Sequence, residues 1–425
     1  MKKVLVVNKY HFVSGGAERY FLSIMEAMKR RGIEPLPFSV NYPQTLPSPY
    51  QHYFIEPVVK GEAAKILHQR PSWRQKIDLF REAVYNDRAA MAVTRMIEDE
   101  RPEIAYFLNF NNHISPSAIS ACVKKGVPVV MRMSDFNLVC SSNMYYRDSH
   151  SCTDCKKGLH HAVMHRCVHG SFTKSLSSVL AMSFHRVWKI YDQVSAFVCP
   201  SNLMKRELEE FGIPSEKLHQ INTFAAPQEK GIPDLKAPYL LYIGRLASYK
   251  GIDIAIRAFS RLKEKFPEVS FYVLGDENDD DAKRVRAVIR ESGAGNVRLL
   301  PFERDKKRVL EYIQHALFMV VPSEFFENLP NTILESFSCG RPVIATRFGS
   351  MPDIVKEGEY GLLYELGNAG DLAEKMSWLI SHNEERERMG ARAYEALRKD
   401  YSEEGHVSRL LDLFESVIRQ GNKRV

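Results

Sequence analysis

Two short segments in the second half of the chain combine charges with backbone features that suit a phosphate. Residues 244–251 open with Gly244 and carry two cations five positions apart, Arg245 and Lys250, ahead of an expected helix. Two fixed positive charges at the end of a strand suit a diphosphate. A surface loop with incidental basic residues explains the same spacing, so this segment alone leaves both interpretations open.

Residues 323–335 place two carboxylates, Glu327 and Glu335, on either side of an expected helix start at Pro330. Proline suits the first turn of a helix, and the free N–H groups of that turn are able to face a phosphate. Carboxylates in this position can accept hydrogen bonds from the hydroxyls of a ribose or a hexose. The alternative is an ordinary helix N-terminus, where acidic residues favour the helix dipole.

A third group of reactive residues is a cluster of cysteines in an irregular, histidine-rich stretch. Cys140, Cys152, Cys155 and Cys167 have the spacing C-x11-C-x2-C-x11-C. One close pair with two flanking cysteines fits a structural zinc site of four thiolates, which would fasten a long loop. Unligated thiols and a redox disulfide are the alternatives.

The elements that must position these residues alternate between strands and helices. This alternation predicts an α/β fold of two Rossmann-like, doubly wound parallel sheets, each covered on both faces. Ligands of such sheets bind at the carboxyl ends of the strands, so we expect two domains facing each other across a cleft. The expected strands are residues 3–8, 35–40, 104–109, 128–133, 196–201, 239–244, 270–275, 297–301, 317–322, 342–347 and 361–364.

A proline-containing stretch with little periodicity, residues 222–238, divides the two halves. We therefore expect one domain over residues 1–222, with a cysteine-rich insert at 140–170, and a second domain over 223–400. The last helix, within 401–425, has a broad apolar face and is expected to pack back on the first domain.

Composition excludes several classes of protein. The 425 residues are 44% hydrophobic and 26% charged, which excludes disorder, collagen and coiled coil for the chain as a whole. No apolar run approaches the ~18 residues of a membrane-spanning helix, and residues 1–8 are too short for a signal peptide, so we expect a cytoplasmic protein. The net charge of +7 fits either a solvated surface or an anionic partner. Seven cysteines without an export signal argue against a disulfide framework.

Taken in order, the two charged segments resemble the donor half of family-4 retaining glycosyltransferases, which have the GT-B architecture. Further stretches fit the same family: 14–18, 275–276, 339–345, 348–352 and 361–363. The resemblance spans nearly the whole chain and is strongest over 239–364. A subset of this family carries a similar cysteine-rich insert in the acceptor domain.

This resemblance implies a role for each matching residue. Arg245 and Lys250 would clamp the donor diphosphate, with Gly244 at the end of the strand before them. Glu335 would hold the ribose, and Asp276 would lie in the loop under the nucleotide base. The donor sugar would be held by Glu327 and by the backbone of Asn328, Leu329 and Pro330. From the other domain, Gly15 and Gly16 would let the backbone approach the phosphates.

On the acceptor side, residues 109–117 resemble a family segment with several histidines, of which His113 is present here. Residues 134–140 resemble a segment that usually begins His-Asp, and here Ser134 occupies the histidine position before Asp135. Asp135 would assist the acceptor hydroxyl; the alternative is a carboxylate that caps a turn. His113 is either an active-site or a structural histidine.

The implied activity is transfer of a hexose-type sugar from a nucleoside-diphosphate sugar to a hydroxyl of a glycan or lipid-linked acceptor. No cofactor is required for this chemistry. The basic segment 60–101 would contact a membrane surface, or it is an ordinary solvated helix. The alternative function is a sugar-nucleotide-binding homologue with weakened transfer that acts as an assembly partner. A nucleic-acid module is disfavoured by dispersed basic residues, and a dehydrogenase by the lack of G-x-G-x-x-G.

Overall fold

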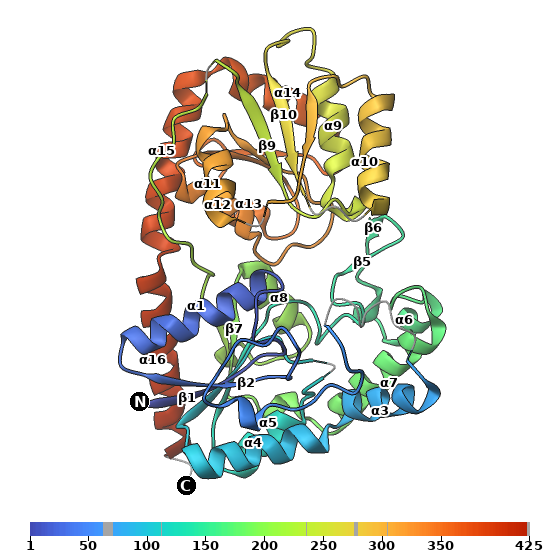
Figure 1. The fold of residues 1–425 in the computed structure, drawn as a ribbon, viewed down its shortest axis with the longest axis vertical. Coiled ribbons are helices and arrows are strands. Elements are labelled where there is room, and N and C mark those ends of the chain that lie inside the picture. Colours follow the sequence, from blue (N-terminus) through green and yellow to red (C-terminus); the bar gives the residue numbers. More distant parts are fainter. Residues whose placement is uncertain (63–70, 112, 235, 276–278, 304, 423–425) are drawn as a thin grey trace. The chain divides into compact units, whose positions relative to one another are not determined.

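The protein is described by a computed structural model that covers residues 1–62, 71–111, 113–234, 236–275, 279–303 and 305–422 (Figure 1). The chain forms two compact units. The first unit contains Met1–Met144, Thr153–Ile221 and Val407–Val425, and the second contains Tyr145–Cys152 and Asn222–His406.

The first unit is built on a parallel six-stranded sheet in the order β2-β1-β3-β4-β7-β8. Its strands are buried along almost their whole length, as expected where helices cover both faces of a sheet. The strands are β1 (Lys3–Val7), β2 (Glu34–Phe38), β3 (Ile104–Phe107), β4 (Val129–Arg132), β7 (Ala196–Cys199) and β8 (Leu218–Gln220). The helices are α1 (Gly16–Arg30), α3 (Trp73–Val84), α4 (Asp87–Glu100), α5 (Ser117–Lys124), α6 (His160–Met164), α7 (Phe172–Val187) and α8 (Asn202–Glu210).

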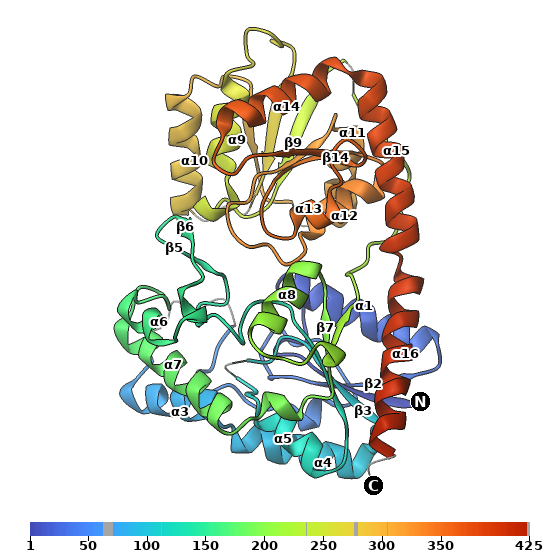
Figure 2. The same cartoon turned by 180° about the vertical axis from the view of Figure 1, so that it is seen from behind.

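The second unit, seen from behind in Figure 2, has its own parallel six-stranded sheet. Its strands lie in the order β11-β10-β9-β12-β13-β14. A separate antiparallel hairpin is formed by β5 (Tyr146–Arg147) and β6 (His150–Ser151). The sheet strands are β9 (Tyr239–Ile243), β10 (Ser270–Leu274), β11 (Val297–Leu300), β12 (Met319–Val321), β13 (Val343–Thr346) and β14 (Gly361–Tyr364). The helices are α9 (Ile252–Ser260), α10 (Asp279–Glu291), α11 (Lys306–His315), α12 (Asn331–Ser338), α13 (Met351–Ile354), α14 (Ala369–Ser381) and α15 (Asn383–Asp400).

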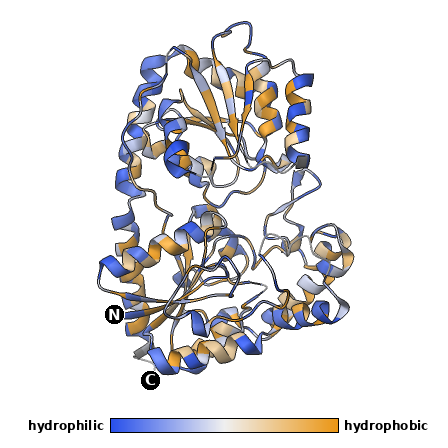
Figure 3. Ribbon diagram, in the orientation of Figure 1, coloured by the Kyte–Doolittle hydropathy of each residue, from blue (hydrophilic) through white to orange (hydrophobic). Residues whose placement is uncertain are grey.

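These two sheets confirm the predicted fold class of two Rossmann-like, doubly wound parallel-sheet domains. Hydrophobic residues concentrate on the strands and the inward faces of the helices, and polar residues on the outward faces (Figure 3). In both sheets the strand order reverses next to the first strand, between β1 and β3 and between β9 and β12. Such a reversal leaves a crevice at the carboxyl ends of the two strands, which is where ligands of these folds bind.

The last helix, α16 (Glu403–Asn422), belongs to the first unit from Val407 onward. Its Phe414 is fully buried, and the Phe414 ring lies 5.2 Å from the ring of Tyr106 in β3. Burial of an aromatic side chain of this kind stabilises the fold by about 1.5–3 kcal/mol.

The cysteine-rich insert differs from expectation in one respect. We predicted that all of residues 140–170 lie in the first domain, but Tyr145–Cys152 lies in the second unit. The physical reason is aromatic packing, because the hairpin rings contact rings of the second unit: Tyr145 lies 5.5 Å from Phe326, and Tyr146 lies 5.6 Å from Tyr249.

Candidate active site

The predicted donor residues of the second unit gather where the order of its sheet reverses. Gly244 and Arg245 directly follow β9, and Ser323 follows β12, the neighbouring strand. The backbone N–H of Glu324 donates to the carbonyl of Tyr249 at 2.9 Å, which ties the two loops together. Both segments singled out in the sequence therefore meet at one edge of one sheet.

Lys250 and Glu327 form a charged pair at the centre of these loops. The Lys250 Nζ lies 2.6 Å from Glu327 Oε1, and Ser323 Oγ donates to the same oxygen at 2.8 Å. The two charged side chains are only 19% and 12% exposed. Charges shielded from water interact more strongly than surface pairs, so this pair holds Lys250 in one orientation.

The position of Lys250 depends on the glycine that follows it. Gly251 has a φ of +70°, in the left-handed region that favours glycine. A Cβ at Gly251 would lie 1.8 Å from the carbonyl oxygen of Pro322, the residue before Ser323. The turn thus brings the backbone of the Arg245–Lys250 loop against the end of the neighbouring strand.

The ring of Tyr249 lies beside the exposed guanidinium of Arg245 and belongs to a small cluster of aromatic side chains. The guanidinium lies 5.5 Å from the ring centre of Tyr249, which itself contacts Phe325 at 5.0 Å and Tyr146 of the hairpin at 5.6 Å. The hairpin is also hydrogen-bonded here, because Ser151 Oγ donates to the carbonyl of Glu324 at 3.2 Å. A cation next to aromatic faces is held in place without losing its charge.

Sequence reasoning missed Tyr145 and Tyr146 as neighbours of the charged loops. A signal was present, because these adjacent tyrosines interrupt a polar, cysteine-rich stretch. Burial, together with the nearby Glu324 carboxylate, raises the pKa of Tyr146 above its usual 10. Tyr146 is therefore a neutral hydrogen-bonding group at neutral pH.

The remaining predicted donor residues lie close by in the chain. Pro330 precedes α12 and is buried, while Asn328 and Leu329 are half-buried. Glu335 lies in the second turn of α12 and is also half-buried. Asp276 lies outside the described residues.

In the first unit, Gly15 and Gly16 begin α1, at the carboxyl end of β1. Gly15 has extended backbone, and a Cβ there would make only ordinary contact with Glu18 at 3.5 Å. The protein's own packing therefore does not demand a glycine at this position. The implied close approach of a ligand to these two glycines stays a prediction.

A second polar cluster missed by sequence reasoning lies beside these glycines, between β1 and β3. The backbone N–H of Asn109 donates to Asn8 Oδ1 at 3.1 Å, and the N–H of Lys9 donates to the Asn109 carbonyl at 2.6 Å. Burial lowers the pKa of Lys9 to about 8, although the nearby Glu18 raises it. Burial also raises the pKa of Glu18. The cluster puts the Lys9 ammonium, which is mostly charged at neutral pH, at a strand end, where an anion would be stabilised.

The three predicted acceptor-side residues have distinct environments. The His113 Nδ1 lies 3.5 Å from the Tyr42 hydroxyl, and burial lowers the pKa of His113 to about 3, so the ring is neutral at pH 7. Ser134 Oγ accepts a hydrogen bond from Arg132 at 3.1 Å. Asp135 Oδ1 accepts from the N–H of Asn137 at 3.1 Å, which makes it a turn-capping carboxylate.

Burial raises the pKa of Asp135 from 3.8 to about 6. Because the pKa of Asp135 is higher in the folded than in the unfolded state, the folded protein binds more protons than the unfolded protein between about pH 4 and pH 6. The free energy of unfolding therefore falls as the pH rises through this window, and the full loss is present above pH 6. Replacing Asp135 with asparagine, which keeps the turn acceptor, is expected to raise the unfolding free energy by about 3 kcal/mol above pH 6. The gain should vanish below about pH 4.

Thermal unfolding measured from pH 3.5 to 8 tests this dependence. The control is Asp280→Asn, whose side chain is 94% exposed. If Asp135→Asn and the wild type differ in Tm by the same amount at every pH, the ionisation of Asp135 does not act on stability.

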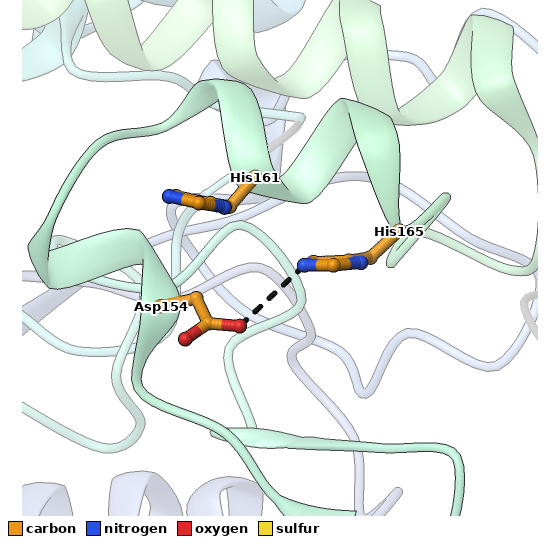
Figure 4. A group of neighbouring side chains, drawn as sticks. All are labelled: Asp154, His161 and His165. Atoms are coloured by element: carbon orange, nitrogen blue, oxygen red, sulfur yellow. Dashed lines mark ion pairs between the residues drawn. The ribbon is translucent and has the colours of Figure 1, made fainter.

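The cysteines do not all share one environment. A hydrogen bond that the Cys155 thiol donates to Cys140, followed by burial, raises the pKa of Cys155, and Cys167 lies near it. Cys152 ends the hairpin segment of the second unit. Among the described residues, the group of three or more potential ligands with mutually close ligand atoms is Asp154, His161 and His165, not the four cysteines (Figure 4). Zinc on the cysteines stays a prediction.

Comparison with protein families relates the second unit to sugar transfer. Residues 225–396 match the family model described as Glycosyl transferases group 1. The lipopolysaccharide core biosynthesis glycosyltransferase LpsE of Rhizobium meliloti is 30% identical over 181 residues, which cover 42% of this chain and 50% of LpsE. The phosphatidyl-myo-inositol mannosyltransferase of Mycobacterium leprae is 24% identical over 263 residues, 60% of this chain and 67% of that protein. The chain thus spans about half the length of LpsE.

Solved structures extend the likeness of fold to nearly the whole chain. Sucrose-phosphate synthase from Thermosynechococcus elongatus has a TM-score of 0.71 at 16% identity and covers 99% of this chain and 100% of its own. Anabaena Alr3699/HepE in complex with UDP-glucose has a TM-score of 0.65 at 15% identity, with 98% and 100% covered. By sequence, residues 225–396 are similar to group 1 glycosyl transferases, and by fold the chain shares the two Rossmann-like domains of these GT-B structures.

Proposed function

We propose that this protein is a retaining glycosyltransferase that moves a hexose-type sugar from a nucleoside-diphosphate sugar to a hydroxyl of a glycan or lipid-linked acceptor. The observation that carries the proposal is the shielded Lys250–Glu327 pair beside Arg245, at the reversal point of a sheet. This is where such folds bind nucleotides, and the two cations match the charge of a diphosphate.

The chemistry requires stabilisation of a leaving group. The bond between the anomeric carbon and the diphosphate oxygen breaks, and its electron pair stays on the diphosphate. The acceptor oxygen bonds to the anomeric carbon on the same face, and its proton passes to the leaving phosphate. Arg245 and Lys250 would stabilise the negative charge that grows on the phosphate more in the transition state than in the ground state. No protein nucleophile is needed.

Glu327 would have two roles in this reaction. Before the donor binds, its carboxylate orients Lys250 through the 2.6 Å contact. When the donor is bound, the same carboxylate would accept hydrogen bonds from the sugar hydroxyls. The backbone of residues 328–330 would make further hydrogen bonds to these hydroxyls. A side chain already held by Lys250 and Ser323 loses little conformational entropy on binding.

A thermal-shift panel of UDP-, GDP- and ADP-sugars tests the proposal. A ligand present at 100 times its Kd stabilises the folded state by about 2.7 kcal/mol. At least one sugar nucleotide should therefore raise the Tm, and the Arg245→Ala/Lys250→Ala double variant should lose most of that increase. The proposal is wrong if no sugar nucleotide in the panel raises the Tm, or if the double variant responds as the wild type does.

The homologue with weakened transfer is kept as a second candidate because Ser134 replaces the usual histidine and is hydrogen-bonded to Arg132. Incubating the bound donor and measuring released nucleoside diphosphate separates the two functions. Release together with a transferred or hydrolysed sugar supports the enzyme, whereas binding without release supports the assembly partner.

We also propose that the first unit contacts an anionic membrane surface, which suits a lipid-linked acceptor. Helices α3 and α7 pack together and carry a stripe of exposed apolar side chains with basic residues beside it. Such a surface binds bilayers by apolar insertion and by attraction to anionic headgroups. No helix in the described part of the chain is long and apolar enough to cross a bilayer. The stripe consists of Trp73, Ile77, Phe172, Leu176, Leu180, Phe184, Val187 and Trp188.

Replacing Phe184 and Trp188 with serine is expected to lower vesicle binding by about tenfold or more, because each ring contributes about 1.5–3 kcal/mol when fully buried. Flotation with vesicles that contain anionic lipid measures the effect, and binding should weaken as salt rises. The control is Ile232→Ser, which alters a side chain 77% exposed in the second unit. Wild-type protein that does not float with the vesicles would contradict the membrane contact.

A further inference from the structure

Three side chains in the cysteine-rich insert converge without involving a cysteine. Asp154 begins the short helix η2 (Asp154–Lys156), His161 lies in α6, and His165 caps the end of α6. Their ligand atoms all lie within 4.8 Å of one another (Figure 4). The Asp154 Oδ2 lies 3.4 Å from His165 Nε2.

The helix brings the two imidazoles together. Residues four apart lie on the same side of a helix, and the rings of His161 and His165 are nearly parallel, at 14°, with centres 5.9 Å apart. Figure 4 shows both rings directed to the side where the Asp154 carboxylate lies. The helical spacing explains why the two imidazoles are neighbours, and the Asp154–His165 contact explains one approach of the carboxylate. Neither requires Asp154 to lie within reach of His161 as well.

The distances suit a small divalent metal. Zinc binds histidine nitrogens and carboxylate oxygens at about 2.0–2.2 Å, so two ligands at tetrahedral angles stand about 3.4 Å apart. Asp154 and His165 already have this separation. The ligand atom of His161 lies within 4.8 Å of the other two, so it has to move by at most about 1.4 Å, which a side-chain rotation provides.

The backbone that carries these ligands is held by other contacts. Lys156 of η2 forms ion pairs with Glu207 at 2.7 Å and Glu210 at 2.8 Å, both in α8. Helix α6 packs over a small apolar cluster that contains Cys155, Leu159 and Ala162. Ligands on independently held elements are pre-arranged, so binding costs little ordering of the chain.

We propose that Asp154, His161 and His165 bind one divalent transition-metal ion of the zinc class, which fastens η2 to α6 within the first unit. All three side chains are half-buried, so water can reach the site and occupy the fourth coordination position of the metal. The site differs in every ligand from the four-cysteine arrangement expected from the sequence. It does not depend on the proposed sugar transfer.

Cobalt(II) is the probe, because its visible spectrum reports the ligands. Full-length protein without an affinity tag is stripped with a chelator and titrated with Co²⁺, and Zn²⁺ is then added in competition. We expect one Co²⁺ per chain, d–d bands without a thiolate-to-cobalt charge-transfer band, and displacement by Zn²⁺. Loss of a group that merely supports a ligand weakens metal binding 10–100-fold, so His161→Ala and His165→Ala should each weaken it by more than about 100-fold.

Matched variants keep the test falsifiable. His160→Ala changes the neighbouring histidine of the same helix, outside the group, and should bind Co²⁺ as the wild type does. His165 caps α6, so His161→Ala provides a variant in which the helix end is intact, and circular dichroism of the metal-free proteins checks folding. Zn²⁺ should raise the Tm of the wild type and of His160→Ala, but not of His161→Ala.

Several results would overturn the proposal. A thiolate charge-transfer band would assign the metal to the cysteines instead. Unchanged Co²⁺ affinity in a folded His161→Ala variant would show that His161 is not a ligand of the metal. Absence of Co²⁺ binding to the wild type would reduce the group to an ion pair with a neighbouring ring.

Discussion

Lys250→Ala is expected to lower the kcat of sugar transfer by about 10²–10³-fold, the cost of losing one charge-stabilising donor from a shielded site. The ammonium is 19% exposed and held by Glu327, so water does not replace it fully. Because the lost interaction strengthens as the diphosphate leaves, kcat should fall more than KM rises. Initial rates of nucleoside-diphosphate release, with the donor identified by thermal shift, measure the effect.

Two further variants separate charge from packing. Lys230→Ala removes a lysine of the same unit that is 50% exposed and lies outside the two loops, and it should leave the rate unchanged. Lys250→Arg keeps the charge but changes the geometry of the donor atoms, so it should retain more activity than alanine. Wild-type rates in Lys250→Ala would show that this lysine does not act on the leaving group.

Gly251→Ala is expected to give the largest loss of stability among the changes considered for the second unit, more than about 3 kcal/mol. An alanine in the left-handed conformation destabilises the folded state by about 1–2 kcal/mol. In addition, its Cβ would meet the Pro322 carbonyl oxygen at 1.8 Å, and backbone cannot rotate away as a side chain can. The end of β12 must shift, and Ser323 and Glu327 follow it.

Gly358 provides a close control for this variant. Its φ is +74°, against +70° for Gly251, but a Cβ there would have nothing within 4 Å. Gly358→Ala should therefore show the cost of the left-handed conformation alone, as a small fall in Tm with donor binding intact. Equal Tm losses for the two variants would mean that the contact with Pro322 is relieved without cost.

The sheets were predictable because buried parallel strands appear in the sequence as short apolar runs. The strand expected over residues 239–244 is Tyr239–Ile243, and the one expected over 297–301 is Val297–Leu300. The prediction of a single helix over the basic segment 60–101 was less accurate. In the described part it divides into α3 and α4, because Asn86 accepts a hydrogen bond from the N–H of Ala89 and starts a new helix. An Asn-Asp pair in a helical stretch is a capping signal that periodicity alone overlooks.

The candidate site was predictable where its residues lie close to strand ends along the chain. The rule that ligands bind at carboxyl ends placed Arg245, Lys250 and Glu327 near the ends of β9 and β12, and the family resemblance then supplied their predicted roles. Tyr146 was not predictable, since it meets Tyr249 across a hundred residues of sequence, and such contacts have no local periodicity. Lys9 was not predicted because the property that singles it out is the pKa lowered by burial. A single lysine after a strand does not show in the sequence whether it is buried.

The β5–β6 hairpin determines where the gene can be cut to express the second unit by itself. The chain passes from one unit to the other after Met144, Cys152, Ile221 and His406, so neither unit is a continuous stretch. A fragment expressed from Asn222 onward would lack Tyr145 and Tyr146, so Tyr249 and Phe326 would lose their contacts with the hairpin rings. The apolar surface bared in this way is of the kind that promotes aggregation. Chimaeras that exchange this half with that of a relative should carry residues 145–152 with it.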